Sequence, residues 1–230
     1  MVATFTHPLD CEPEADGHRP SAFVVRRGLV GFVALMVLGN LAIAGVSAWA
    51  RRTTPVLPAP QVTGIKNFRV VDAHVWRGAA PSARGYESLA AAGVRTVIDL
   101  RAEPNLHVDE ELLARLGIQH LAIPLRDGQT PSPAEIERFL ATVTSSAGPV
   151  FVHCGAGVGR TGTMVAAYLV ATGEANEWTA MRRNLSVGPP SLEQLAFVAG
   201  LEDGDRPGPL LVTVSRVLDA PRRLWSRLRA

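Results

Sequence analysis

The chain has 230 residues, a formal net charge of +2 at pH 7, 47% apolar residues and 19% charged residues. This length favours one folded domain with additional segments, and the small net charge gives no support for a nucleic-acid partner, so none is expected. The two cysteines, Cys11 and Cys154, allow one bridge at most and exclude a disulfide framework.

Residues 1–27 contain several prolines and acids and few large apolar residues, which predicts a disordered N-terminal tail. The run 28–50 has no charged residue and is bounded by arginine pairs on both sides. As a helix it would be about 34 Å long, enough to cross a bilayer, and Trp49 lies where an interfacial aromatic is found. We therefore predict a single transmembrane helix over 28–50. A buried helix of a soluble domain and a cleaved signal peptide are the alternatives.

After a predicted semi-extended linker over 51–64, short apolar runs alternate with amphipathic helices. The predicted helices cover 82–92, 109–116, 133–144, 160–172, 176–185 and 191–201, and the predicted strands cover 94–99, 118–123 and 150–153. The third of these helices opens with a capping box from Ser132 to Glu135. This alternation predicts an α/β domain over 65–204, with a mostly parallel sheet flanked by helices on both faces.

The segment 205–230 combines arginines with leucines and a tryptophan, which predicts a basic amphipathic tail that Pro221 interrupts. Such a helix can lie on an anionic lipid surface. It can equally be solvated or docked on the domain, and both alternatives stay open.

The stretch 149–163, PVFVHCGAGVGRTGT, joins an apolar strand to a helix through a loop of small residues. Glycines let such a loop turn so that successive N–H groups point inward and form a nest for an anion. The N-terminal end of the following helix adds positive potential at the same place. An arginine side chain there supplies a planar fork for two phosphate oxygens. The predicted phosphate-binding residues are Gly155, Ala156, Gly157, Val158, Gly159 and Arg160.

Cys154 comes at the base of this nest, where the inward N–H groups and the helix dipole favour its thiolate. We predict that Cys154 attacks a bound phosphate in line and forms a phosphocysteine intermediate, which water then hydrolyses. Thr161 would donate its hydroxyl toward the sulfur and help it to leave. His153 is predicted to orient the loop rather than to act as a base.

Two other loop motifs compete with this interpretation. A Walker A loop ends in Gly-Lys-Ser/Thr, and this loop has no lysine. The run 157–162 does fit the dinucleotide fingerprint G-x-G-x-x-G, which requires an acid on a following strand. Glu174 and Glu177 fall near a predicted helix start instead, and the dinucleotide alternative gives Cys154 and Arg160 no role.

The pattern His-Cys-x-x-Gly-x-x-Arg-Thr-Gly, over residues 153–162, resembles the signature loop of the protein tyrosine and dual-specificity phosphatases. The segments VWRGAAPS, TVIDLRAE and SLEQLAFV are similar to segments of bacterial members, so the resemblance covers about 65–202. It implies a tyrosine-phosphatase-like fold, hydrolysis of phosphate monoesters, and a mechanism that uses no metal and no other cofactor.

The resemblance also implies an aspartate on a mobile loop upstream of the cysteine, which protonates the leaving oxygen. Asp127, in a turn-rich loop after the predicted strand 118–123, is the predicted acid. An ordinary turn aspartate beside Gly128 is the alternative. Asp99 is the second candidate, although it could instead pair with Arg101. The family's Trp-Pro-Asp sequence is absent from this loop.

We therefore predict hydrolysis of phosphotyrosine on proteins, with phosphoserine and phosphothreonine as further substrates. A phosphatase of membrane lipid phosphates and a catalytically inactive phosphate-binding scaffold are the alternatives. Uncharged loop positions favour a single phosphate over a polyanionic headgroup, and the intact Cys154 and Arg160 argue against a scaffold. The expected location is a single pass through the bacterial inner membrane. Arginines at both ends of the span leave the side of the catalytic domain open.

Overall fold

The computed structural model describes residues 22–104 and 108–228. They divide into two compact units, one ending at Leu38 and the other beginning at Gly39. Disorder is predicted for the tail 1–27, and residues 1–21 of this tail lie outside the described residues. Its last residues, from Ala22, are helical.

The helix α1 spans Ala22–Thr53, so it begins before the predicted Gly28 and continues past the predicted end of the span. From Arg26 to Thr53 the helix is long and apolar enough to cross a membrane, and its most apolar window of 18 residues has a mean hydropathy of 2.3. A signal sequence near an N-terminus has the same length and composition. The transmembrane span over 28–50 therefore stays a prediction.

The C-terminal part of α1 is packed within the second unit. Ser47 is 1% exposed, and its hydroxyl donates a hydrogen bond of 2.7 Å to the carbonyl oxygen of Leu185. Ala50 is fully buried, and the side-chain amide of Asn40 donates to the carbonyl oxygen of Leu218 at 3.4 Å. These contacts make the last turns of α1 a structural part of the folded domain.

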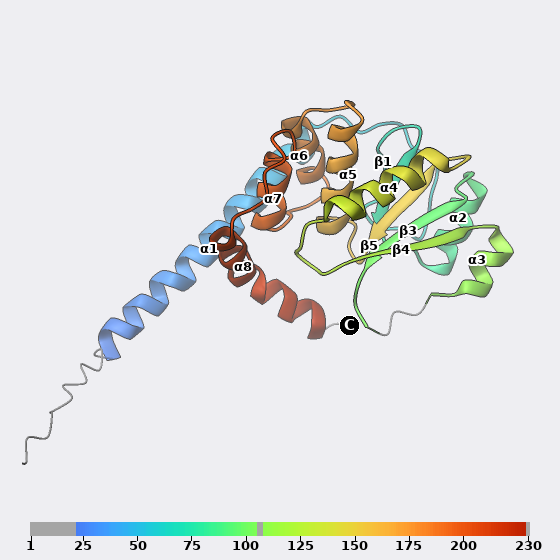
Figure 1. The fold of residues 1–230 in the computed structure, drawn as a ribbon. Helices are drawn as coiled ribbons and strands as arrows, with labels where there is room; N and C mark the ends of the chain where they lie inside the picture. The colour runs from blue at the N-terminus through green and yellow to red at the C-terminus, as the bar shows by residue number, and fades with distance from the viewer. Residues whose placement is uncertain (1–21, 105–107, 229–230) are drawn as a thin grey trace, which may run out of the picture. The chain divides into compact units, whose positions relative to one another are not determined.

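A five-stranded sheet forms the centre of the domain, in the spatial order β1-β2-β5-β3-β4 (Figure 1). The strands are β1 (Arg69–Val70), β2 (Val75–Ala79), β3 (Thr96–Arg101), β4 (Gln119–Leu125) and β5 (Val150–Cys154). Only β1 runs antiparallel to its neighbour, so the predicted mostly parallel sheet is confirmed. The two strands β1 and β2 were not predicted. All five residues of β2 are buried, Arg77 among them, so the strand lacks the alternation that marks a half-buried strand.

Five helices of the domain begin at side-chain caps that the sequence makes recognisable, namely Ser82, Asp109, Ser132, Asn176 and Ser191. The helices of the domain are α2 (Ala83–Ala91), α3 (Glu110–Leu116), α4 (Pro133–Ser145), α5 (Gly159–Ala171), α6 (Glu177–Leu185), α7 (Leu192–Ala199) and α8 (Pro209–Leu228). The predicted capping box is present at α4, where the Glu135 carboxylate accepts from the Ser132 backbone N–H at 2.6 Å. The helix α8 runs through Pro221, so the predicted interruption at that residue is wrong.

Two apolar cores cover the two faces of the sheet. On one face Ile98 and Val152 pack with residues of α4, α5 and α7, among them Phe139. On the other face Phe151 packs with residues of α2 and α3, among them Leu89. Neighbouring residues of one strand therefore point into different cores, which is the arrangement of a parallel sheet buried on both sides.

The connection from β5 to α5 lies at the carboxyl end of the central strand. β5 ends at Cys154 and α5 begins at Gly159, so the predicted loop is the whole of this connection. In open α/β sheets this edge is where ligands bind, because loops and helix N-termini meet there.

Candidate active site

The carbonyl oxygens of residues 155–158, in the loop between β5 and α5, accept hydrogen bonds from residues that surround the loop. The Gly155 and Ala156 oxygens accept from the Ala80 N–H at 3.2 Å and from the Asn67 amide at 2.9 Å. The oxygens of the next two residues, Gly157 and Val158, accept from Nη2 of Arg77 at 2.7 and 3.3 Å.

In a trans peptide the N–H points away from the carbonyl oxygen of the same unit. Because four successive carbonyls point outward, the N–H groups of residues 156–159 point to the other side, into the concave face of the loop. Gly157 has a φ of 70°, and a Cβ there would overlap the backbone of Gly78. Only glycine therefore fits this turn, and this loop geometry supports the anion nest, which stays a prediction.

Arg160 is 4% exposed and lies in the first turn of α5, directly after the nest. Its Nη1 and Nη2 donate to the two carboxylate oxygens of Glu103 at 2.9 and 2.7 Å, and Nη1 also donates to the Leu125 carbonyl oxygen at 3.1 Å. Its Nε is buried and has no hydrogen-bond partner among the described residues. One edge of the guanidinium is therefore held in place, and the Nε edge is available to a ligand.

The charges around Arg160 support one another. Burial lowers the pKa of Arg160, but the hydrogen bonds to Glu103 and the attraction of Cys154 and Asp127 outweigh it and raise this pKa above its ordinary value. Burial likewise raises the pKa of Glu103, and the hydrogen bond and charge of Arg160 reverse the shift and lower it. Both groups are therefore ionised near neutral pH.

Cys154 is a free cysteine, 3% exposed, at the end of β5 and at the base of the nest. Thr161, in the first turn of α5, is fully buried, and its hydroxyl has no hydrogen-bond partner among the described residues. Since buried hydroxyls are normally paired, an unpaired hydroxyl here fits the predicted donation to the Cys154 sulfur, which stays a prediction.

His153 is fully buried, and its Nδ1 lies 3.4 Å from the Cys154 carbonyl oxygen and 3.7 Å from a carboxylate oxygen of Asp99. Burial lowers the pKa of His153 to about 4, against the opposing attraction of Asp99. A neutral imidazole beside the strand end fits an orienting role and not the role of a base that gains a proton near pH 7.

Asp99 is 3% exposed and accepts three hydrogen bonds from the Arg101 guanidinium, the shortest of 2.7 Å. Burial raises the pKa of Asp99, but the nearby His120, with Nε2 3.9 Å from Oδ2, and the hydrogen bonds from Arg101 hold it well below its usual range. A carboxylate that stays ionised and paired is poorly suited to give up a proton, which favours the pairing alternative for Asp99.

Asp127 lies on the exposed loop after β4, with its Oδ1 3.6 Å from Nε of Arg160. It therefore stands beside the edge of the guanidinium that is available to a ligand. The loop is attached to α7, because the Ser191 hydroxyl donates to the Gly128 carbonyl oxygen and the Gln194 amide donates to the Gln129 carbonyl oxygen, each at 3.3 Å.

Four residues of this site were not found by sequence reasoning: Glu103, Arg77, Asn67 and Gln194. Glu103 and Arg77 do lie within two of the segments that resemble bacterial phosphatases, TVIDLRAE and VWRGAAPS, which was the available signal. The dinucleotide alternative fails on topology, because α5 is followed by α6 and not by a strand that could carry the ribose-binding acid.

Residues 60–200 match the family model described as the DSP-PTPase phosphatase fused to NAD+ kinase. Among curated proteins, the chain is 33% identical over 102 residues to tyrosine-protein phosphatase cdc-14 of Caenorhabditis elegans. This alignment covers 42% of this chain and 14% of the C. elegans protein. The first curated relatives are all matched over 20% of their own length or less.

Two solved structures share the fold. One is a form of Pseudomonas aeruginosa TpbA in complex with pTyr, 20% identical with a TM-score of 0.52, covering 65% of this chain and 89% of TpbA. The other is PTPMT1 in complex with PI(5)P, 24% identical with a TM-score of 0.52, covering 60% of this chain and 95% of PTPMT1. At these identities the likeness concerns the fold alone.

Proposed function

Because this chain belongs to the DSP-PTPase phosphatase family, we propose that it hydrolyses phosphate monoesters by nucleophilic attack of Cys154. The observation that carries the proposal is the outward pairing of four successive loop carbonyls, from which we infer that four N–H groups face the inner side of the loop that follows Cys154. The N-terminal end of α5 and the Nε edge of Arg160 add positive charge there, so a phosphate is the anion expected.

In the first step the Sγ of Cys154 attacks phosphorus while the bond from phosphorus to the leaving oxygen breaks. Asp127 gives its proton to that oxygen. Its position beside the Nε edge of Arg160, where the phosphate is expected to bind, supports this role. In the second step water gives a proton to the Asp127 carboxylate and attacks phosphorus, the S–P bond breaks to restore the Cys154 thiolate, and inorganic phosphate leaves. The unpaired hydroxyl of Thr161 would stabilise the departing thiolate.

Glu103 leaves the ligand-binding capacity of Arg160 intact. A guanidinium has five N–H donors, and the carboxylate uses one on each terminal nitrogen. The Nε–H and the second N–H of Nη2 form the other fork, which matches two oxygens of a phosphate. The same fork binds the equatorial oxygens of the transition state, so it supports turnover as well as binding.

We propose phosphotyrosine on proteins as the substrate, with phosphoserine and phosphothreonine as further ones. The side chains of the loop, at Gly155, Ala156 and Val158, carry no charge, which suits a single phosphate. The fold is shared with TpbA, seen with pTyr, and with PTPMT1, seen with PI(5)P. A lipid phosphate is therefore the second candidate, and α1, proposed as an anchor in the bacterial inner membrane, would bring the site near lipid.

The test is hydrolysis by the full chain in detergent, with phosphotyrosine, phosphoserine and phosphoinositide substrates compared at equal concentration. We expect the highest kcat/KM for the phosphotyrosine peptide. Cys154→Ser should abolish turnover and keep vanadate binding, because the N–H groups and Arg160 do the binding. Substantial activity in Cys154→Ser would refute the mechanism, and a clear preference for phosphoinositide would replace the protein substrate with the lipid.

A further inference from the structure

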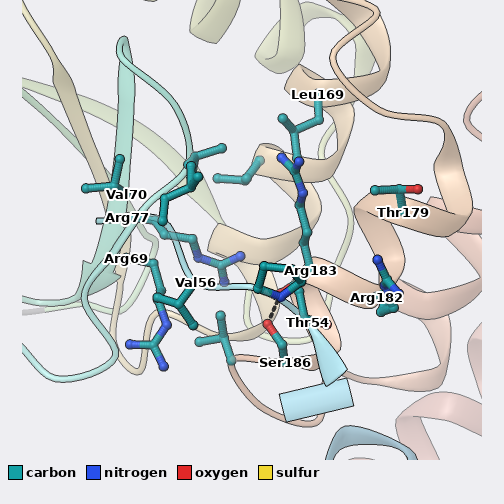
Figure 2. Close-up of a pocket in the computed structure, with 15 residues that line it drawn as sticks. Thr54, Val56, Arg69, Val70, Arg77, Leu169, Thr179, Arg182, Arg183 and Ser186 are labelled. Carbon is teal, nitrogen blue, oxygen red and sulfur yellow. Dashed lines mark hydrogen bonds between the residues drawn. The ribbon is translucent and has the colours of Figure 1, made fainter. Parts of the chain in front are cut away.

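A cavity of about 190 Å³ is lined by the segment after α1, the strands β1 and β2, and the helices α5 and α6. Arg77 connects it to the loop 155–159, which we call the phosphate loop, because Arg77 lines the cavity and binds two carbonyls of this loop. Four of its lining residues are arginines from three different elements, namely Arg69, Arg77, Arg182 and Arg183 (Figure 2). The other lining residues are apolar or hydroxyl-bearing, and none is acidic. We call this cavity the arginine pocket.

The arginine pocket contains buried polar atoms that lack a partner. Arg77 is 3% exposed, and its Nε has no hydrogen-bond partner among the described residues. The Thr54 hydroxyl, on the opposite wall, is also buried and unpaired among them. Buried donors of this kind are normally satisfied, so two of them in one cavity indicate a ligand with acceptor oxygens.

The charges in the pocket point to an anion. Arg69 and Arg77 are directly paired in the register of β1 and β2, and like charges in that position destabilise a sheet. Burial lowers the pKa of Arg77 to about 10, attraction to Cys154 opposes this shift, and repulsion from Arg69 adds to it. An anion between the two guanidinium groups would remove their repulsion.

The volume of the pocket and its lining residues limit the class of anion that can bind there. A cavity of about 150 Å³ holds the six carbons of benzene, so this one takes on the order of eight non-hydrogen atoms. A phosphate with three glycerol carbons has that size. Val56 and Leu57, which line the pocket directly after α1, are 62% and 45% exposed. They would offer the acyl chains an apolar surface beside the pocket.

We propose that the arginine pocket binds the glycerophosphate headgroup of an anionic phospholipid and transmits its presence to the phosphate loop through Arg77. The connection is direct, since Nη2 of Arg77 donates to the loop carbonyls of Gly157 and Val158. An anion beside Arg77 partly neutralises the charge that attracts the Cys154 thiolate. Lipid binding therefore lowers kcat/KM.

The test uses the full chain in an uncharged detergent, with dihexanoyl phosphatidylglycerol as the probe. This lipid is a phosphodiester, so the proposed phosphomonoester hydrolysis does not consume it. Native mass spectrometry counts the bound lipid, and the activity toward an aryl phosphate is measured in parallel. Dihexanoyl phosphatidylcholine, which has no net charge, and glycerophosphoglycerol, which has no acyl chains, separate the roles of charge and chains.

The deciding variant is Arg182→Gln with Arg183→Gln, which removes two pocket charges outside the phosphate loop. The matched control is Arg51→Gln with Arg52→Gln, because these two arginines are exposed on the last turn of α1 and do not line the pocket. We expect the pocket variant to lose about tenfold in affinity for phosphatidylglycerol. The wild type and the control variant should bind it equally, and only they should lose kcat/KM on binding.

Four outcomes would overturn the proposal. Equal phosphatidylglycerol binding by the pocket variant would remove the site, and equal binding of phosphatidylcholine would remove the role of charge. Equal binding of glycerophosphoglycerol would assign the pocket to a soluble anion. Binding with unchanged kcat/KM would refute the connection through Arg77. The binding measurement is independent of the proposed catalytic mechanism, whereas the kinetic one rests on it.

Discussion

Glu103 holds Arg160 by two hydrogen bonds of 2.9 and 2.7 Å, from a position 57 residues away in the chain. This pair fixes the plane of the guanidinium before any substrate is present. Preorganised donors are effective in catalysis because they do not have to reorganise when charge develops in the transition state. Glu103 is therefore a positioning residue, since it acts on the substrate through Arg160.

Replacing Glu103 by glutamine should lower kcat/KM for an aryl phosphate by about tenfold. Hydrogen bonds between charged groups contribute about 1.5–3 kcal/mol, and we take the lower end because the Glu103 side chain is 45% exposed. The inhibition constant for vanadate should rise in parallel, because vanadate uses the same fork. Glu137→Gln, an exposed change on α4, is the matched control. Unchanged vanadate inhibition in Glu103→Gln would show that Arg160 keeps its position without Glu103.

The two candidate acids are separated by their response to the leaving group. Asp127→Asn should lower kcat for a phosphotyrosine peptide by about 10²–10⁴-fold and affect an activated aryl phosphate much less, because a good leaving group needs no proton. Asp99→Asn should instead destabilise the fold by about 3 kcal/mol, the lower end for a buried pair, since it leaves the partly buried Arg101 guanidinium without its counter-charge. Thermal unfolding and kinetics with both substrates measure these effects. A substrate-selective loss in Asp99→Asn would reverse the assignment.

His153 should make the domain less stable in acid. Its pKa is about 4 in the folded state, against an ordinary value of 6.5 for histidine in the unfolded chain. Between these two pH values the unfolded chain therefore binds a proton that the folded chain does not. The free energy of unfolding should therefore fall by roughly 3 kcal/mol as the pH drops from 6.5 to 4.

His120 acts with the opposite sign, because its contact with Asp99 raises its pKa, so the measurement is best made in the His120→Gln variant. Denaturant titrations across this pH range give the free energy, and the imidazole resonances of His153 give its pKa directly. A His153 pKa near 6.5 in the folded state would contradict the prediction.

Two truncations test the part played by α1. A fragment of residues 39–230 keeps the hydrogen bond from Ser47 to Leu185 and the buried Ala50, whereas a fragment of residues 53–230 loses both. Both should keep the kcat of the full chain, since no candidate site residue lies before residue 53. The shorter fragment should lose about 1 kcal/mol of the free energy of unfolding, so its unfolding temperature should be about 2–4 °C lower than that of the 39–230 fragment.

Membrane fractionation of the full chain and of both fragments completes this test. We expect the full chain to sediment with membranes and the 39–230 fragment to remain soluble and active. Recovery of the full chain in the soluble fraction would refute the proposed anchor. Loss of activity in the 39–230 fragment would mean that the first part of α1 belongs to the catalytic fold.

The phosphate loop could be predicted from the sequence because its properties are local. Small residues between Cys154 and Arg160 allow only a tight turn, and the strand before it and the helix after it are set by neighbouring residues. For the same reason the capping box at Ser132 and the mostly parallel sheet could be predicted. The transmembrane span follows from composition and length in the same way, and it stays a prediction.

Only the tertiary structure identifies the groups that hold this loop open. The loop carbonyls are bound by Asn67 and Arg77, which are 89 and 80 residues away from the carbonyls they bind. Such partners depend on which strands lie side by side, and the order β1-β2-β5-β3-β4 brings together segments that have no regular spacing in the chain. The arginine pocket has the same origin, because its four arginines come from β1, β2 and α6 and meet only when these elements pack.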